Sequence, residues 1–257
     1  MKVVLFCGGL GMRLREYSES IPKPMVNVGY RPILWNIMRY YAHYGHTEFI
    51  LCLGYKGDLI KQYFLNYNEY MSNDFVFSEG GKNLNLIKSD IQDWKITFVD
   101  TGMTSNIGER LVKVKEHVGE DEYFLANYAD GLSDVPLDSM LESYMAKPKI
   151  ASFLAFKSTQ SFHVVRLKED NGVESISPIA NSGYLVNCGF FIMSRHIFDY
   201  IKPGEELVEY PFQRLIDEDQ LFAYPYNGFW IAMDTFKDKQ VLDDMYTRGE
   251  KPWEVWR

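Results

Sequence analysis

The residues that decide the fold of this chain read Val3-Val4-Leu5-Phe6-Cys7-Gly8-Gly9-Leu10-Gly11-Met12-Arg13-Leu14. The first five are apolar, and such a short run bounded by glycine predicts a buried strand. The glycines that follow permit positive φ angles and let backbone amides approach an anion closely. A strand that runs into this loop predicts a phosphate-binding turn; a glycine turn with surface basic residues is the plainer alternative.

Further short apolar runs recur along the chain and predict buried strands at Glu48–Gly54, Lys95–Asp100, Glu122–Tyr128, Ile150–Phe156 and Gly189–Met193. Apolar residues at helical spacing predict helices at Ile33–Tyr44 and Gly57–Tyr67. This alternation predicts an α/β fold with a Rossmann-like, mostly parallel sheet flanked by helices. Ligands of such sheets bind beyond the carboxyl ends of the strands, so the loops after Cys7, Gly54 and Tyr128 form the candidate site.

The pattern changes from about Lys157 to shorter strands and turns. Asp170-Asn171-Gly172 predicts a hairpin turn between Val164–Lys168 and Val173–Ile176, in a small β-rich insertion that we expect to cover the site. Helices are expected around Pro211–Glu218 and at Lys237–Tyr246. We therefore expect one domain over residues 1–257, with a nucleotide-binding core at about 1–156 and an acceptor-side insertion with C-terminal helices at about 157–257.

Charge and cysteine usage narrow the class of protein. The 257 residues carry a net charge of -8, from 35 acidic and 27 basic residues, without a basic block, which argues against nucleic-acid binding. An anionic ligand must then be held by a few local cations, backbone amides or a metal ion. No membrane segment or signal peptide is recognised, so a cytoplasmic location is expected. Cys7, Cys52 and Cys188 have no pairing or metal-ligand spacing, which predicts buried free thiols.

Two aspartates stand in contexts that suit a metal ion. Asp130 follows a predicted strand and precedes Gly131, and Asp234 lies in an apolar segment where a lone carboxylate is costly to bury. Either one alone is equally consistent with an ordinary acidic turn. Together they fit Mg²⁺, which usually takes one or two protein carboxylates and completes its shell with phosphate oxygens and water. Asp134 is expected to cap a turn or helix.

The glycine loop is followed by Pro22-Lys23-Pro24-Met25, and with it the chain resembles the sugar nucleotidylyltransferases, whose signature is Gly-Gly-x-Gly-x-Arg-Leu and then Pro-Lys-Pro-Met. The resemblance implies a nucleotide-diphospho-sugar transferase-like fold. It also implies that Arg13 and Lys23 bind the triphosphate and stabilise the departing pyrophosphate, and that Asp130 and Asp234 bind Mg²⁺. An acceptor phosphate is already anionic near neutral pH, so this transfer requires no general base.

Within that family the chain most resembles the glucose-1-phosphate cytidylyltransferases, notably at Gly54-Tyr55-Lys56-Gly57 and at Asp130-Gly131-Leu132-Ser133-Asp134-Val135. The resemblance implies CTP as the nucleotide. The nucleotide-binding residues are then expected to be Cys7, Gly8, Gly9, Gly11, Met12, Gly54, Tyr55, Lys56, Tyr128 and Ala129. Lys56 has donors for the cytosine carbonyl, although Tyr55 and Lys56 are also compatible with simply ending a strand. Ile107-Gly108-Glu109-Arg110 stands where the family shows Thr-Gly-Gly-Arg, so contacts there stay open.

The acceptor half departs from the family. Its Glu-Lys-Pro segment supplies a lysine to the acceptor phosphate, but this chain reads Ile176-Ser177-Pro178-Ile179-Ala180-Asn181-Ser182-Gly183, and an Arg-Phe-Gly turn is replaced around Ser161-Phe162-His163. The lost contact is worth about 1.5–3 kcal/mol. We therefore expect an acceptor other than a standard hexose 1-phosphate, such as phosphoglutamine or a phosphonate used in capsule or surface polysaccharide modification. The alternative is glucose 1-phosphate with a replacement cation. The acceptor-binding candidates are His163, Arg166, Asn187 and Gly189.

Two other functions are compatible with parts of the sequence, and one segment predicts self-association. A catalytically silent nucleotide-binding regulatory protein has less use for the pyrophosphate-side cations Arg13 and Lys23. A dinucleotide-dependent oxidoreductase needs an acidic ribose partner near the end of the second strand, where Leu53–Gly57 has none. The aromatic-rich segment Tyr63–Phe77 exceeds what one helix face can bury, which predicts a homo-oligomer.

Overall fold

The computed structural model describes residues 1–9, 21–157 and 162–257. Its strands are β1 (Val3–Phe6), β2 (Asn27–Val28), β3 (Arg31–Pro32), β4 (Glu48–Leu53), β5 (Phe75–Ser78), β6 (Asn83–Leu86), β7 (Lys95–Asp100), β8 (Tyr123–Tyr128), β9 (Gly131–Ser133), β10 (Ala151–Lys157), β11 (His163–Leu167), β12 (Val173–Pro178), β13 (Leu185–Asn187), β14 (Phe191–Ser194), β15 (Leu221–Tyr226) and β16 (Trp230–Ala232). Its α-helices are α2 (Ile33–His43), α3 (Gly57–Leu65), α4 (Ile107–Lys113), α5 (Lys115–Val118), α6 (Leu137–Ala146), α7 (Tyr210–Asp217) and α8 (Phe236–Thr247). The 3-10 helices are η2 (Lys23–Met25), η3 (Glu69–Met71), η4 (Glu79–Gly81), η5 (Ile179–Asn181) and η6 (Arg195–Asp199).

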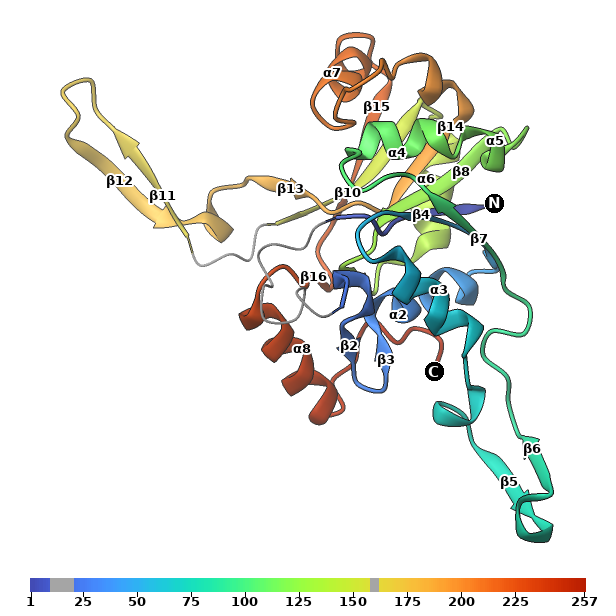
Figure 1. The fold of residues 1–257 in the computed structure, drawn as a ribbon. Helices are drawn as coiled ribbons and strands as arrows, with labels where there is room; N and C mark the ends of the chain where they lie inside the picture. The colour runs from blue at the N-terminus through green and yellow to red at the C-terminus, as the bar shows by residue number, and fades with distance from the viewer. Residues whose placement is uncertain (10–20, 158–161) are drawn as a thin grey trace.

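An 8-stranded sheet forms the centre of the molecule, in the order β13-β10-β14-β8-β1-β4-β7, with β15 paired to β10 (Figure 1). Strand β1 runs parallel to both β4 and β8, and β4 runs parallel to β7. Strand β14 runs antiparallel to β8 and β10, which makes the sheet mixed. The expected fold class, a mostly parallel sheet flanked by helices, is confirmed. The carboxyl ends of β1, β4, β7 and β8 consequently meet at one edge of the sheet.

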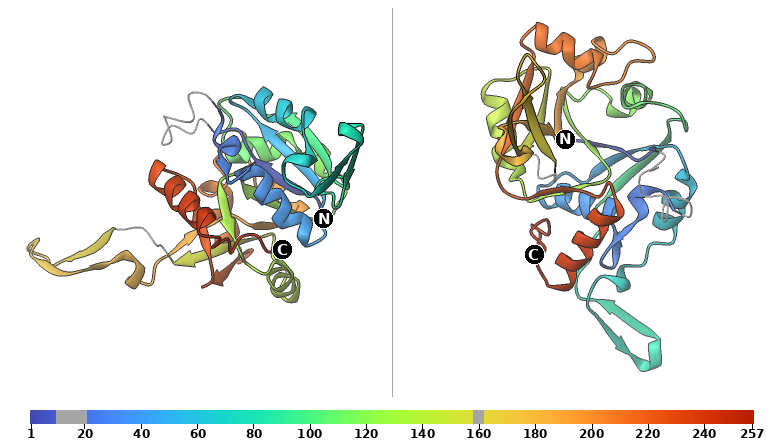
Figure 2. Two further views of the ribbon diagram at one scale, coloured as in Figure 1. Left: turned by 90° about the horizontal axis from the view of Figure 1, so that it is seen from below. Right: turned by 90° about the vertical axis from the view of Figure 1, so that its left-hand side faces the viewer.

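Strand β1 is apolar throughout because both of its faces are covered. Val3 and Leu5 belong to one hydrophobic cluster, which includes side chains of α2 and α6. Val4 and Phe6 belong to a second cluster, which includes side chains of α4, α5 and α7. A strand buried on both faces needs apolar residues at every position, and this fixes the start of the glycine loop at the edge of the core. Figure 2 shows helices on either side of the sheet.

Most elements predicted from the sequence occur within one or two residues of their predicted bounds. The predicted strand Gly189–Met193 begins later, as β14, because Gly189 has a φ of 75° and turns the chain. The sequence did not predict strands β2, β3, β5, β6, β9, β13, β15 and β16 or helices α4 and α6. Strand β15 contains Pro225, which argues against a strand in sequence alone but is tolerated at the edge of the sheet.

Two hairpins project from the body in different directions (Figures 1 and 2). One is β5–β6, and the other is β11–β12, whose turn at Asp170–Gly172 was predicted; each pairs only within itself. The expectation that the β-rich insertion covers the site is wrong for β11–β12, because this hairpin stands away from the sheet. A two-stranded hairpin without a supporting layer is only marginally stable in water.

Within the described ranges, no helix is long and apolar enough to cross a membrane. Cys7, Cys52 and Cys188 are free and buried, as predicted. Burial raises the pKa of the Cys52 and Cys188 thiols to about 12, so both are protonated at neutral pH.

Candidate active site

A short antiparallel ribbon brings the two predicted metal-binding aspartates together. Strand β16 pairs with β9 so that Ala232 faces Gly131, and the Met233 amide donates to the Asp130 carbonyl at 2.9 Å. Asp130 directly precedes β9, and Asp234 follows β16 by two residues. Because the strands are antiparallel, residues that precede one and follow the other lie at the same end of the ribbon. Positions more than a hundred residues apart in sequence therefore meet beside the carboxyl end of β8.

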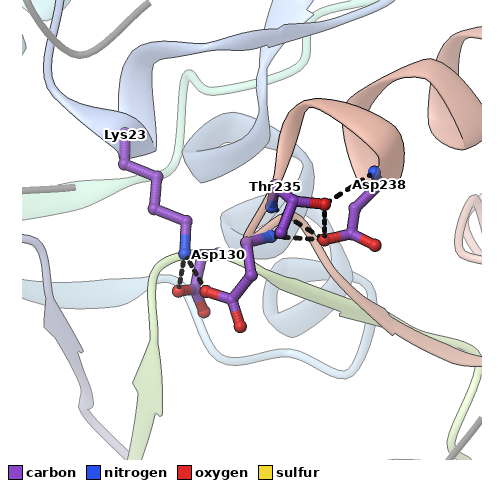
Figure 3. A network of polar contacts seen from close by, with 5 residues as sticks. Lys23, Asp130, Thr235 and Asp238 are labelled. Atoms are coloured by element: carbon purple, nitrogen blue, oxygen red, sulfur yellow. Dashed lines mark hydrogen bonds and ion pairs between the residues drawn. The ribbon is translucent and has the colours of Figure 1, made fainter. Parts of the chain in front are cut away.

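Lys23 lies between these two carboxylates (Figure 3). Its Nζ atom is 2.6 Å from Asp130 Oδ2 and 2.6 Å from Asp234 Oδ1. Lys23 begins η2 between Pro22 and Pro24, whose rings fix the local φ angles, and Pro24 is buried. Burial by itself lowers the pKa of the Lys23 ammonium, but the charges and hydrogen bonds of Asp130 and Asp234 outweigh it and raise the pKa. The ammonium is therefore charged at neutral pH, and it marks a point where two carboxylate oxygens converge on one cation.

Asp238 fixes the backbone on which Asp234 stands. Its Oδ2 atom accepts from the Thr235 amide at 2.7 Å and from the Asp234 amide at 3.2 Å (Figure 3). Thr235 caps α8 in return, because its hydroxyl accepts from the Asp238 amide. This reciprocal arrangement is a capping box, and it holds the start of α8 against the site. The sequence reading missed Asp238, although the spacing Thr235-x-x-Asp238 was a usable signal.

Asp134 has a different use from Asp130. Its Oδ1 atom accepts from the Phe229 amide at 2.7 Å and from the Tyr226 hydroxyl at 2.7 Å. These bonds clasp the turn that leads into β16, and the expected turn-capping role of Asp134 is confirmed. Within the described part of the chain, no group of three or more His, Cys, Asp or Glu side chains could hold a metal ion. The Asp130 and Asp234 pair is thus a two-carboxylate arrangement, which suits a metal that keeps other ligands.

The glycines expected to face the nucleotide lie at the same edge of the sheet. The Cys7 amide continues the pairing of β1 with β4 by donating to the Cys52 carbonyl at 3.0 Å. Gly8 and Gly54 approach each other so closely that a Cβ atom on Gly54 would lie 2.8 Å from the Gly8 carbonyl oxygen. The buried Arg110 donates to that same carbonyl at 2.9 Å. Sequence reasoning left Arg110 open, and its retention within the altered segment Ile107–Arg110 was the available signal.

The remaining nucleotide-side residues border this edge. Lys56 has a φ of 51° and precedes α3, and its Nζ atom lies 5.3 Å from the centre of the Tyr55 ring. Ala129 is buried, and the Tyr128 ring packs between Phe6 and Phe191. Burial raises the pKa of the Tyr128 hydroxyl, which stays protonated. Gly11, Met12 and Arg13 lie outside the described residues.

The acceptor-side candidates divide into two groups. Gly189 lies beside Tyr128, since a Cβ atom on Gly189 would be 3.0 Å from the Tyr128 ring, and the Asn187 side chain accepts from the Gly189 amide at 2.9 Å. His163 and Arg166 are exposed on β11, in the projecting hairpin. The structure therefore brings Asn187 and Gly189 to the edge that carries Asp130, and it does not bring His163 and Arg166 there.

The chain is similar in sequence to proteins of a known family. The Nucleotidyl transferase family model matches residues 2–236. A "Probable glucose-1-phosphate cytidylyltransferase" of Bacillus subtilis is 36% identical over 258 residues, covering 100% of both chains. A glucose-1-phosphate cytidylyltransferase of Salmonella typhimurium is 36% identical over 257 residues, again with 100% of both chains covered.

Solved structures share the fold at lower sequence identity. HddC from Yersinia pseudotuberculosis superposes with a TM-score of 0.67 at 21% identity, covering 95% of this chain and 99% of HddC. A UDP-glucose pyrophosphorylase complexed with UDP-glucose superposes with a TM-score of 0.70 at 15% identity, covering 96% and 98% of the two chains. At such identities the likeness concerns the arrangement of the sheet and its helices.

Proposed function

The chain belongs to the nucleotidyl transferase family, and from this premise we propose that it transfers a cytidylyl group from CTP to a small phosphorylated acceptor and releases pyrophosphate. The observation that carries the proposal is the position of Lys23 Nζ, 2.6 Å from one oxygen of Asp130 and 2.6 Å from one oxygen of Asp234. A cation at this point, beside the glycine edge, lies where a nucleotide triphosphate would need charge neutralised.

The donor set fits Mg²⁺. Two carboxylate oxygens converge on one cationic atom, and both belong to hard anionic ligands of the type that Mg²⁺ prefers. Asp130 and Asp234 would hold the ion, leaving its other positions to phosphate oxygens and water. When bound, Mg²⁺ would neutralise charge on the α-phosphate and the departing pyrophosphate. A metal ion held by Asp130 and Asp234 would compete with Lys23 for these carboxylates, so removal of the lysine charge should raise the affinity for the metal.

The chain's own residues then act by positioning and by charge. An acceptor phosphate oxygen attacks the α-phosphorus of CTP in line, forming the new P–O bond as the bond to pyrophosphate breaks. Lys23 and Arg13 would stabilise the negative charge that develops on the leaving group. The glycine edge would hold the triphosphate through backbone amides. No residue needs to remove a proton, because the acceptor phosphate is already anionic near neutral pH.

CTP is favoured over other nucleotides by the relatives and by one segment. The two full-length relatives at 36% identity are cytidylyltransferases by their names. Gly54-Tyr55-Lys56-Gly57, the segment that resembles the cytidylyl branch, lies at the glycine edge. We infer that this segment contacts the base.

We infer an acceptor other than a standard hexose 1-phosphate. The segment that lacks the family's lysine, Ile176–Gly183, includes the end of β12 and η5, and Ser177, Ile179 and Asn181 give it no positive charge. A phosphorylated amino-acid amide such as phosphoglutamine, or a phosphonate, fits this loss better than a sugar that needs the lysine. Glucose 1-phosphate is the second candidate, because both relatives are named for it.

A pyrophosphate-release assay tests the proposal. CTP, UTP, dTTP and ATP are each crossed with glucose 1-phosphate and a panel of non-sugar phosphates, with Mg²⁺ present or chelated. We expect release with CTP and a non-sugar phosphate, and none after chelation. Release with CTP and glucose 1-phosphate alone would identify an ordinary sugar cytidylyltransferase. Tight CTP binding without release from any acceptor would favour the silent regulatory protein instead.

We propose that the chain forms a homo-oligomer through its hairpins. Of the aromatic segment Tyr63–Phe77, the first part is used within the chain: the Tyr67 hydroxyl accepts from Trp35 at 2.7 Å and donates to Asp90 at 2.8 Å. In the later part, Phe77 on β5 is 64% exposed. Such exposed apolar surface on a projecting ribbon suits burial against a second copy. A monomer at micromolar concentration in light scattering would contradict this proposal.

A further inference from the structure

Arg110 in α4 is a buried arginine at the edge of the proposed nucleotide site. It is 2% exposed, and within the described residues all hydrogen bonds of its guanidinium go to neutral acceptors. Burying a guanidinium without a carboxylate partner costs free energy of folding. This cost indicates that Arg110 has a role besides packing. Its planar fork of donors is suited to holding several acceptors in fixed directions at once.

The acceptors of Arg110 come from the ends of three neighbouring strands. Its Nη1 atom donates to the Leu53 carbonyl at 3.1 Å and to the Thr101 hydroxyl at 2.7 Å, and its Nη2 atom donates to the Gly8 carbonyl at 2.9 Å. Leu53 ends β4, Thr101 follows β7, and Gly8 follows β1 by two residues. One side chain thus ties together the loops that leave three adjacent parallel strands on the nucleotide side.

Two glycines of the site lie close to this guanidinium, and at Gly54 the backbone oxygens of Gly8 and Gly102 crowd the same space. A Cβ atom on Gly8 would lie 1.9 Å from Arg110 Nη1, and a Cβ atom on Gly54 would lie 2.9 Å from the same nitrogen. Both distances are shorter than any real contact, so a larger residue at either position would displace Arg110. The backbone at Gly8 and Gly54 therefore packs closely against the guanidinium, so these two glycines have a structural role that does not depend on a ligand.

The bond to Gly8 also fixes the direction of the next amide. In a planar trans peptide the carbonyl and the N–H point to opposite sides, and no cis peptide occurs among the described residues. With the Gly8 carbonyl held toward the buried Arg110, the Gly9 N–H points away from the guanidinium. Gly9 is exposed, and its N–H donates no hydrogen bond within the described residues. An exposed amide directed outward beside the carboxyl end of β1 is a donor for an anion.

We propose that Arg110 is a positioning residue that aims the Gly9 amide at a phosphate oxygen of the bound nucleotide by holding the Gly8 carbonyl. The inference rests on the proposed function, because the anion is the triphosphate of the nucleotide substrate. It assigns no contact between Arg110 and the nucleotide itself.

Calorimetric titration of nucleotide into variant proteins tests this inference. Arg110→Met removes the donors at similar length, and Arg110→Lys keeps the charge but not the fork. Arg214→Met is the control, since Arg214 lies partly buried on α7 and also donates to a backbone carbonyl, that of Tyr200 at 2.7 Å, and it differs from Arg110 in pairing with Glu205 as well. We expect a Kd for CTP raised about ten- to a hundredfold in Arg110→Met and unchanged in Arg214→Met.

Two further readouts separate positioning from a general loss of structure. Added guanidinium ion, far below denaturing concentration, is expected to restore part of the CTP affinity of Arg110→Ala. The ¹⁵N resonance of Gly9 is expected to shift on CTP binding in the wild type and not in Arg110→Met. A folded Arg110→Met that binds CTP like the wild type would overturn the inference, and if that variant does not fold, wild-type affinity in Arg110→Lys would overturn it.

Failure of the proposed function gives a different result. If the wild type binds UTP, dTTP or ATP and not CTP, the choice of nucleotide is wrong, and the same comparison of variants with the nucleotide that binds decides the role of Arg110. If the wild type binds none of the four, both the nucleotidyl-transfer proposal and the positioning role are overturned.

Discussion

The nucleotide side and the acceptor side of this molecule are built in opposite ways. On the nucleotide side, Lys23 and Arg110 are both held by other groups of this chain: Lys23 lies between Asp130 and Asp234, and Arg110 donates to neutral acceptors on loops from three strands. On the acceptor side His163 and Arg166 stand exposed on a hairpin that leaves the body. Within the described residues, the chain brings Lys23, Asp130 and Asp234 together, whereas it leaves His163 and Arg166 away from the other acceptor-side candidates, Asn187 and Gly189.

The largest expected effect comes from removing either carboxylate of the nucleotide side. Asp130→Asn or Asp234→Asn should lower turnover about a thousandfold, because the loss of metal-assisted charge stabilisation is worth several kcal/mol. Asp134→Asn is the control, since an amide oxygen can still accept from Phe229 and Tyr226. Steady-state pyrophosphate release checks this, and near-wild-type turnover in either variant would remove that aspartate from the metal site.

The next effect concerns the exposed hairpin. Arg166→Ala should raise the KM for the acceptor about ten- to a hundredfold if the hairpin supplies a charge-assisted contact to a neighbouring copy, and it should leave the Kd for CTP unchanged. Mixing Arg166→Ala with Asp130→Asn should then restore activity, because mixed assemblies contain sites with an intact pair of aspartates and an intact hairpin. Wild-type acceptor kinetics in Arg166→Ala would show that the hairpin takes no part.

A smaller effect is expected at the capping box. Asp238→Ala should weaken metal binding about tenfold, because the Asp234 backbone loses the acceptor that fixes it, and it should also lower the stability of the protein. Asp238→Asn retains an acceptor oxygen, so its metal affinity and stability should lie between those of the wild type and Asp238→Ala. Metal titration together with thermal unfolding measures both quantities; a stability loss with unchanged metal affinity would make Asp238 a helix cap and nothing more.

The smallest expected effect is a difference in thiol labelling between Cys7 on the nucleotide side and Cys188 on the acceptor side. Neither Cys7 nor Cys188 should react with a thiol reagent at pH 8 in the native state, because burial raises the pKa of both thiols and keeps them protonated. In dilute denaturant Cys188 should label first, since it follows the short strand β13, which pairs only with β10. Mass spectrometry locates the label. Labelling of Cys7 before Cys188 would show that the acceptor side is the more tightly packed of the two, against the expectation.

The sequence signals of the nucleotide side are local. Val3–Cys7 is apolar and leads into glycines, and Lys23 and Asp130 stand in short motifs that can be recognised without a structure. The convergence of Asp130 and Asp234 depends on the pairing of β9 with β16, two strands that were not predicted from the sequence.

The rest of the site depends on contacts between distant segments. Arg110 is buried because Gly8, Leu53 and Thr101 meet around it, and no single segment of sequence contains that information. The β5–β6 hairpin was missed because its apolar residues serve no core of this chain. The β11–β12 hairpin was predicted correctly from its turn, yet its direction was wrong, since a turn fixes the register of a hairpin but not where the hairpin points.

We propose that the point held by the Lys23 ammonium is the cation site of the reaction. The most direct test is a titration with Mn²⁺, followed by electron paramagnetic resonance, of the wild type and Lys23→Met without nucleotide. We expect at least about tenfold tighter Mn²⁺ binding in Lys23→Met, because a competing positive charge is removed from between Asp130 and Asp234. Equal or weaker binding in that variant would contradict the claim and would leave the three residues as a structural ion pair.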